Sequence, residues 1–170
     1  FNLKQNVRSY GGVIMNKTEI LISNFYHSIN ILDVSLFTIE TITERLSIKL
    51  CYWSHSSAIA SYGDMCCVFI NESLSKCGQW QNFGHEMYHY LHDETSYDLL
   101  NESYAEYGET KADYFAYHFC VPTFMLQQLK EVSVYDVMEL FNVEFDFAMR
   151  RLEMYQSKII ERSTSFERTY

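Results

Sequence analysis

The stretch that decides the fold of this chain is Gly84-His85-Glu86-Met87-Tyr88-His89. On an α-helix, residues four positions apart lie on one face, about 40° apart around the axis. His85 and His89 would therefore project side by side and could hold one metal ion between them. Glu86 would lie roughly 60° from His89, within reach of a ligand on that metal. This arrangement is typical of zinc metalloproteases, with two imidazole ligands and Glu86 as the general base.

The bulk composition indicates one folded domain. The chain has 170 residues, of which 48% are hydrophobic and 16% aromatic, and this is enough for a core. The formal net charge is −9 and Lys and Arg form no cluster, so we expect no direct binding to nucleic acid. The five cysteines include no C-x-x-C pair, which favours reduced cysteines in a cytoplasmic protein. No apolar run is long enough for a transmembrane helix, so we expect no membrane partner.

Apolar spacing predicts a mainly helical α+β domain with a small sheet before the His-Glu-x-x-His helix. The expected helices cover residues 18–29, 39–46, 79–93, 103–120, 124–130, 134–141 and 145–154. The expected strands cover residues 48–53, 58–62 and 65–71, with the last two joined as a hairpin by Gly63-Asp64. We expect residues 1–14 to be a leader or extension, 15–156 to be the domain, and 157–170 to be a polar, frayed tail.

A catalytic zinc site needs a third protein ligand and leaves the fourth position for water. His92 lies only about 20° from His85 around the helix, but roughly 10 Å along its axis. Metal–nitrogen bonds of about 2.0–2.1 Å do not span that distance in a straight helix. We therefore expect His92 to be a flanking group that supports the ligands. By the same geometry His118 points away from Glu109, and we expect a partly exposed structural histidine.

Glu109 is the better candidate for the third ligand. It shares a helical face with Asp113, beside an apolar stripe that would pack the helix on the core. Asp113 could then accept the free ring N–H of a ligating histidine and fix its tautomer. The alternative is a solvated acidic face. Lys111 is the only Lys or Arg between Asp93 and Gln128, so an accumulation of acid there favours a bound cation.

Together these motifs resemble the ImmA/IrrE family of metallopeptidases. The family pattern is HELGH, often followed by LH, then E-x-x-A-N-x-F-A, then a hydrophobic pair and Met-Pro. The corresponding segments here are residues 85–92, 109–116 and 121–122, and the similarity extends from about Ile20 to Tyr155. Met87-Tyr88 stands where the family has Leu-Gly, and Asp113 stands where it usually has Asn. We expect Tyr88 to narrow the substrate cleft.

The resemblance implies a single zincin-like domain that acts as a zinc-dependent endopeptidase of bacterial or phage origin. One Zn²⁺ per chain would be held by His85, His89 and Glu109 in a gluzincin-like set. The implied protein substrate is a helix-turn-helix transcriptional repressor of a phage or mobile element, which would be cleaved or otherwise inactivated. Tyr104 and Tyr107 both remain candidates for stabilising the oxyanion.

Two other functions are weighed against this one. The first is a non-proteolytic regulatory binding protein, such as a repressor partner or an antitoxin-like module, that retains a zinc site. The second is DNA binding by a helix-turn-helix-like pair over residues 134–155. Its second helix presents no basic face, because Glu144, Asp146 and Glu153 accompany its two arginines. The peptidase is favoured because the motifs supply a complete set of catalytic-type residues.

Overall fold

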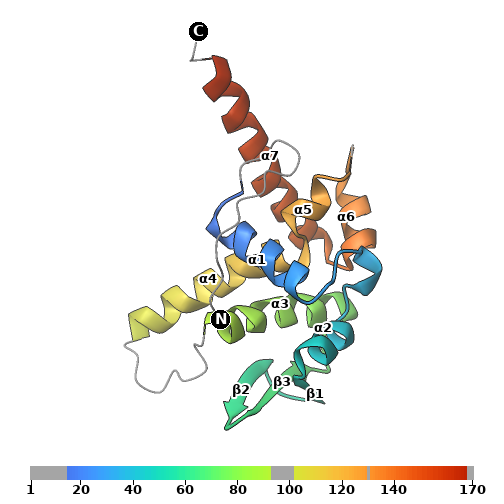
Figure 1. Cartoon of the computed structure of the whole chain (residues 1–170), viewed down its shortest axis with the longest axis vertical. Coiled ribbons are helices and arrows are strands. Elements are labelled where there is room, and N and C mark those ends of the chain that lie inside the picture. The colour runs from blue at the N-terminus through green and yellow to red at the C-terminus, as the bar shows by residue number, and fades with distance from the viewer. Residues whose placement is uncertain (1–14, 93–101, 130, 168–170) are drawn as a thin grey trace.

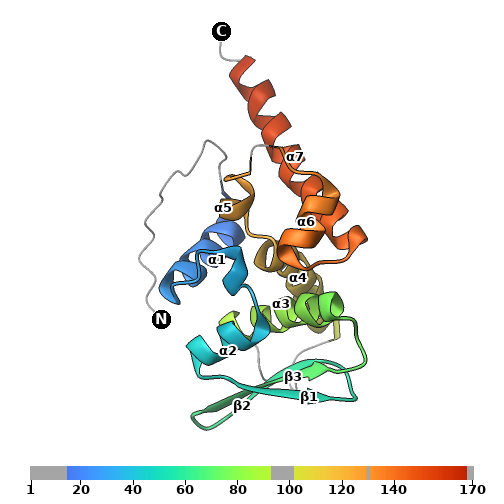
Figure 2. The same ribbon diagram turned by 90° about the vertical axis from the view of Figure 1, so that its right-hand side faces the viewer.

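In the computed structural model, residues 15–92, 102–129 and 131–167 are described. A small sheet forms one end of the molecule, and the helices lie on one side of it (Figures 1 and 2). The strands are β1 (Lys49–Trp53), β2 (Ala58–Tyr62) and β3 (Met65–Asn71), in the spatial order β1-β3-β2. β3 pairs in parallel with β1 and antiparallel with β2, so the predicted hairpin is confirmed. The domain is mainly helical with a small sheet, as the sequence predicts.

Several of the helices begin after a residue whose side chain accepts a hydrogen bond from a free backbone N–H group of the first turn. The helices are α1 (Lys17–Ser28), the 3₁₀ turn η1 (Val34–Leu36), α2 (Ile39–Leu46), α3 (Lys76–His92), α4 (Glu102–Cys120), α5 (Thr123–Leu126), α6 (Val134–Phe141) and α7 (Phe145–Glu167). Asn16 and Glu19 form a capping box at the start of α1, and Ser133 and Asp136 form another at α6. Thr38 caps α2 as predicted.

Three helix boundaries differ from the predicted ones by more than one residue. α3 begins at Lys76 rather than 79, because the Ser75 hydroxyl accepts a hydrogen bond from the Gly78 N–H at 2.9 Å and caps the first turn. α5 ends at Leu126 instead of 130. α7 continues to Glu167, so residues 157–167 are helical rather than frayed. The predicted leader, residues 1–14, lies outside the described residues.

Close packing of α3 against α4 depends on Gly84. A Cβ atom at this position would lie 2.7 Å from the Cys120 sulfur and 3.3 Å from the Phe119 ring. Around this contact Trp80, Phe83 and Phe119 form part of one continuous hydrophobic core. The two helices therefore approach along a face that has no room for even one methyl group, and this fixes their relative position.

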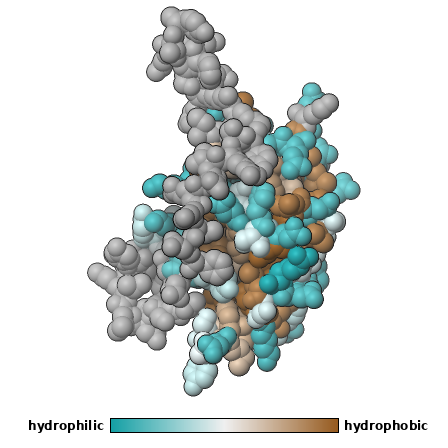
Figure 3. All heavy atoms as spheres, in the orientation of Figure 1, coloured by the Kyte–Doolittle hydropathy of each residue, from teal (hydrophilic) through white to brown (hydrophobic). Residues whose placement is uncertain are grey.

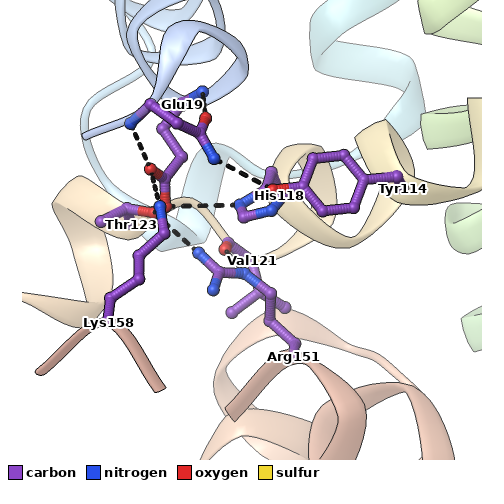
Figure 4. A network of polar contacts seen from close by, with 8 residues as sticks. Glu19, Tyr114, His118, Val121, Thr123, Arg151 and Lys158 are labelled. Atoms are coloured by element: carbon purple, nitrogen blue, oxygen red, sulfur yellow. Dashed lines mark hydrogen bonds and ion pairs between the residues drawn. The ribbon is translucent and has the colours of Figure 1, made fainter. Parts of the chain in front are cut away.

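A buried polar network joins α1, α4, α5 and α7 (Figure 4). Glu19 is only 2% exposed; its carboxylate accepts a hydrogen bond from the Thr123 hydroxyl at 2.6 Å and pairs with Lys158. Burial opposes the charged form of Glu19, but hydrogen bonds from Lys158 and Thr123 outweigh it and lower the pKa of the carboxyl. The pairing ties the part of α7 that lies beyond residue 156 to the first helix of the domain.

Arg151 and His118 complete this network. The buried Arg151 guanidinium donates to the Val121 carbonyl at 3.0 Å and to the Thr123 hydroxyl at 2.7 Å. His118 lies with its Nδ1 3.5 Å from the Glu19 carboxylate and is fully buried, so the prediction of a partly exposed side chain is wrong. Burial, helped by the charge of Arg151, lowers the pKa of His118 to about 3. His118 is therefore neutral at physiological pH.

The surface is not uniformly polar. Figure 3 shows apolar residues among polar ones on the right-hand side of the molecule, where Figure 1 places α6. Tyr135 and Leu140 on this helix are 71% and 40% exposed. Within the described residues, no helix combines the length and apolar character that crossing a membrane requires.

Candidate metal centre

The packing of α3 on α4 brings three potential metal ligands together. His85 and His89 project from α3, and Glu109 projects from the facing side of α4. The two imidazole Nε2 atoms lie 3.3 Å apart. The Glu109 carboxylate lies 3.1 Å from Nε2 of His85 and 3.7 Å from Nε2 of His89. Among the described His, Cys, Asp and Glu residues, these three form the one group whose donor atoms could share a metal ion.

The spacing of these donors suits a tetrahedral ion. With metal–donor bonds of about 2.1 Å, two tetrahedral ligands lie roughly 3.4 Å apart. The three observed separations, 3.1, 3.3 and 3.7 Å, lie on both sides of that value. Two histidines and one glutamate are also a known ligand set of catalytic zinc sites, which leave one position open. The residues therefore fit a zinc ion in both geometry and chemistry.

Asp113 orients the first of these ligands. Its carboxylate lies 2.8 Å from Nδ1 of His85, one helical turn beyond Glu109. If Nδ1–H donates to Asp113, the Nε2 atom of a neutral imidazole carries a lone pair, and that lone pair faces the Glu109 carboxylate. Two acceptors at 3.1 Å repel each other unless a proton or a cation lies between them. The contact with Asp113 thus favours a cation at the cluster.

Glu86 lies beside the cluster in a partly buried position between α3 and β2. Burial raises the pKa of its carboxyl to about 7; the charge of Glu109 adds to the rise, while His85 and the backbone N–H of Ile59 oppose it. No sequence pattern indicates the contact between Ile59 and Glu86. Ile59 is an ordinary strand residue in the pattern, and only the placement of β2 beside α3 brings its N–H to this carboxylate.

His92 is not among the donors of this group, and the Tyr88 ring lies edge-on to the His89 ring with 5.4 Å between their centres. Nδ1 of His92 is 2.8 Å from the Tyr88 carbonyl, and its ring stacks on the Tyr88 ring at 4.1 Å. The supporting role expected for His92 thus has less geometric basis than that of Asp113. Tyr88 is only 6% exposed and packs against Phe115 of α4. The expectation that it narrows the cleft is wrong, because its ring lies in the helix interface.

Of the two tyrosines considered for stabilising the oxyanion, only Tyr107 has a side chain that the structure describes. Tyr107 is 59% exposed, and the Lys111 ammonium lies 4.3 Å from the centre of its ring. The side chain of Tyr104 lies outside the described residues. The choice between them therefore stays open.

A His-Glu-x-x-His motif on a helix is typical of metallopeptidases. Residues 38–153 match the Peptidase_M78 family, described as the IrrE N-terminal-like domain. The chain belongs to this family, which is a family of metallopeptidases. The resemblance found in the sequence is confirmed.

Two relatives from Bacillus subtilis (strain 168) are similar over most of the chain. One is the phage-like element PBSX protein XkdA, 29% identical over 152 residues, which are 86% of this chain and 77% of the relative. The other is the uncharacterized protein YqaB, 28% identical over 145 residues, which are 82% of this chain and 84% of the relative. No solved structure matches the chain significantly.

Proposed function

We propose that this chain is a zinc-dependent endopeptidase that holds one Zn²⁺ on His85, His89 and Glu109. The observation that carries the proposal is the set of three donor atoms, all within 4.8 Å of one another. Asp113 supports it by holding the His85 ring in the orientation that turns Nε2 toward the other two donors. Membership of a metallopeptidase family agrees with this assignment.

Each residue then has a distinct task in hydrolysis. Zinc in such a site polarises the scissile carbonyl and lowers the pKa of a water to about 7. Glu86 is placed to accept a proton from the attacking water and to deliver it to the leaving amine. Burial favours the protonated form of this carboxyl, which helps it to hold the proton between the two transfers. The Ile59 N–H keeps the carboxyl oriented beside the donors.

The peptide substrate has a place to bind along β2. This strand pairs with β3 on one side, and within the described residues no strand pairs with its other edge. A free strand edge offers backbone N–H and C=O groups to an extended peptide. Because Ile59 of β2 contacts Glu86, a peptide on this edge would lie beside the general base.

The proposed substrate is a helix-turn-helix transcriptional repressor of a phage or mobile element, cleaved or inactivated in the cytoplasm. XkdA, one of the relatives, is a protein of a phage-like element, and this supports a role in phage regulation. Repressors that bind DNA carry basic surfaces. The net charge of −9 on this chain would favour encounter with such a partner.

Metal analysis and one conservative substitution test the proposal. We expect about one zinc per chain in the purified protein, and much weaker retention in Glu109→Ala. Glu86→Gln should keep the zinc but lose cleavage of a co-expressed repressor, because the amide accepts no proton. A matched control is Glu139→Gln, which alters an exposed carboxylate on α6.

The same experiment separates the peptidase from a regulatory binding protein. Repressor that disappears equally with parent and Glu86→Gln proteins would rule out the peptidase. Repressor that is bound but left intact by both would support the non-proteolytic alternative. Zinc retained in full by Glu109→Ala would instead show that the third ligand is wrongly assigned.

A further inference from the structure

The inner face of the sheet is covered unevenly by α3. Directly paired residues of neighbouring strands point to the same face of a sheet. Ile59 and Val68 are paired, point toward the helices and are buried. Ser61 and Cys66 form the next pair on this face, but Ser61 is exposed and Cys66 is only half-buried. The space between the sheet and α3 is therefore closed at Ile59 and open at Ser61.

Tyr90 of α3 faces this opening. It lies one helical turn beyond Glu86, on the same face of the helix. Its side chain is half-buried, and burial, together with the nearby Cys66 thiol, raises the pKa of its hydroxyl. Among the described residues, no group forms a hydrogen bond with this hydroxyl. The Tyr90 side chain is thus held at the opening with its polar atom available to a ligand.

β2 and α3 advance together, and this fixes where a bound peptide meets Tyr90. The Ile59 N–H contacts the Glu86 carboxylate. Cys66, the partner of Ser61 in the sheet, lies beside Tyr90. Two residues of a strand rise about 6.7 Å and four residues of a helix about 6 Å, so two residues of β2 match one turn of α3. Figure 1 shows β2 below the C-terminal half of α3, which it contacts.

The free edge of β2 offers a further backbone group at the level of Tyr90. N–H groups alternate between the two edges of a strand, so the Ser61 N–H points to the same edge as the Ile59 N–H. A peptide on this edge, with its scissile bond at Glu86, has two residues that lie opposite Ile59 and Ser61. The residue opposite Ser61 is then the second or third from the cut, and its side chain can point inward to Tyr90.

The side chains at this position define what they can bind. We call Tyr90, Ser61 and Cys66 the Tyr90 subsite. Its polar groups are two hydroxyls and a thiol, beside an aromatic ring. A guanidinium or ammonium group donates to hydroxyl oxygens and is attracted to the face of an aromatic ring. A carboxylate in the same place would lie one helical turn from the Glu86 carboxylate, and like charges repel. The subsite therefore favours a basic side chain over an acidic one.

We propose that the Tyr90 subsite selects substrates with Arg or Lys at the second or third residue from the cut, and this inference rests on the endopeptidase function proposed above. Arg fits better than Lys, because its planar group stacks on aromatic rings and presents several N–H donors at once. Glu86 and the metal centre carry out hydrolysis, whereas Tyr90 chooses the segment that is cut. A repressor that binds DNA offers such segments, since its surface is rich in Lys and Arg.

Cleavage of a mixed peptide library by the zinc-loaded protein tests the proposal. Mass spectrometry gives the positions of the cuts. Values of kcat/KM are then compared for four peptides that differ only at the second or third residue from the cut, where they carry Arg, Gln, Leu or Glu. One test variant is Tyr90→Leu, which removes the ring and the hydroxyl. The other is Ser61→Lys, which adds a positive charge at an exposed position. The matched control is Tyr135→Leu, the same change at an exposed tyrosine on α6.

We expect the parent to cleave the Arg peptide with a kcat/KM about fivefold higher than that of the Gln peptide, the scale of a cation–π contact at an exposed site. Tyr90→Leu should lose most of this ratio, and Tyr135→Leu should keep it. Ser61→Lys should reverse the order of the Arg and Glu peptides. A change in folding or metal content lowers kcat/KM for all four peptides alike, so the ratios report the contact itself.

Two results would overturn the inference alone. They are cleavage by the parent without a preference for Arg over Gln, and a preference that Ser61→Lys leaves unchanged. The second result decides even if Tyr90→Leu does not fold. Library peptides that the parent leaves intact, or that Glu86→Gln cuts equally well, would instead reject the proposed endopeptidase and the Tyr90 subsite with it.

Discussion

Replacing Asp113 should weaken zinc binding without removing any proposed ligand. The carboxylate lies 2.8 Å from Nδ1 of His85 and orients the ring that faces the metal position. Loss of such a partner typically lowers metal affinity about 10–100-fold. The Asp113 side chain is 72% exposed, and solvent screens its charge. We therefore expect the lower end for Asp113→Ala, about tenfold or roughly 1.4 kcal/mol.

Asp113→Asn introduces the residue that the ImmA/IrrE pattern usually has at this position. It separates the effect of the hydrogen bond on zinc affinity from the effect of the negative charge. The amide oxygen still accepts from Nδ1–H, so this variant should lose less affinity than Asp113→Ala. The assay is competition for Zn²⁺ against a chromophoric chelator at one fixed pH. Asp146→Ala, which removes an exposed carboxylate from α7, controls for the change in net charge.

Parent-like zinc affinity in Asp113→Ala would refute this reasoning. It would show that packing alone orients His85, or that zinc binds elsewhere. An equal loss in Asp146→Ala would show instead that the overall negative charge, rather than the contact with His85, governs affinity. Circular dichroism of each variant checks that α4 still folds.

Three further predictions concern the stability of the domain. Gly84→Ala should lower the free energy of unfolding in urea by about 1–3 kcal/mol, because the new methyl group would lie 2.7 Å from the Cys120 sulfur. Cys120→Ala in the same chain should recover part of this loss. If the effects of the two substitutions simply add, the proposed clash is wrong. Ser133→Ala should cost about 1 kcal/mol through loss of the α6 cap. Ser133→Thr should retain most of the stability, because its hydroxyl can still accept from the Asp136 N–H and donate to the Asp136 carboxylate. Burial lowers the pKa of His118 to about 3, so on acidification below about 6.5 the unfolded chain takes up this proton first. The contribution of His118 to the free energy of unfolding should then fall by at most about 1.4 kcal/mol per pH unit. The unfolding free energy of His118→Gln, measured over the same pH range, should fall less steeply than that of the parent. Equal pH dependence of the two proteins would contradict the lowered pKa of His118.

Sequence periodicity anticipated the parts of the site that lie on single helices. The 3.6-residue repeat places His85 beside His89, and Glu109 beside Asp113, whatever the tertiary structure. The rejection of His92 as a ligand used only the rise of the helix, and among the described residues His92 is not part of the group whose donor atoms could share a metal. Such local geometry is set before any packing takes place.

Features that need two distant segments could not be predicted in this way. The Ile59 N–H reaches Glu86 only because β2 takes the outer position in the sheet, and strand order depends on long-range pairing. Tyr88 was expected in the cleft, but the facing surface of α4 buries it. His118 was expected to be partly exposed, but α1 and α7 meet over it and bury it. In each case the missing information is which surface an element packs against.

The ion pair between buried Glu19 and part-buried Lys158 has a consequence for the order of folding. The two residues are 139 positions apart in the chain, so their meeting closes a very long loop at a large cost in chain entropy. The β-hairpin and the α3–α4 pair join much nearer segments and can form earlier. We expect the last part of α7 to dock late, which would place its contribution mainly in the unfolding rate. The polar network of Figure 4 would then slow the unfolding of the folded domain without speeding its folding.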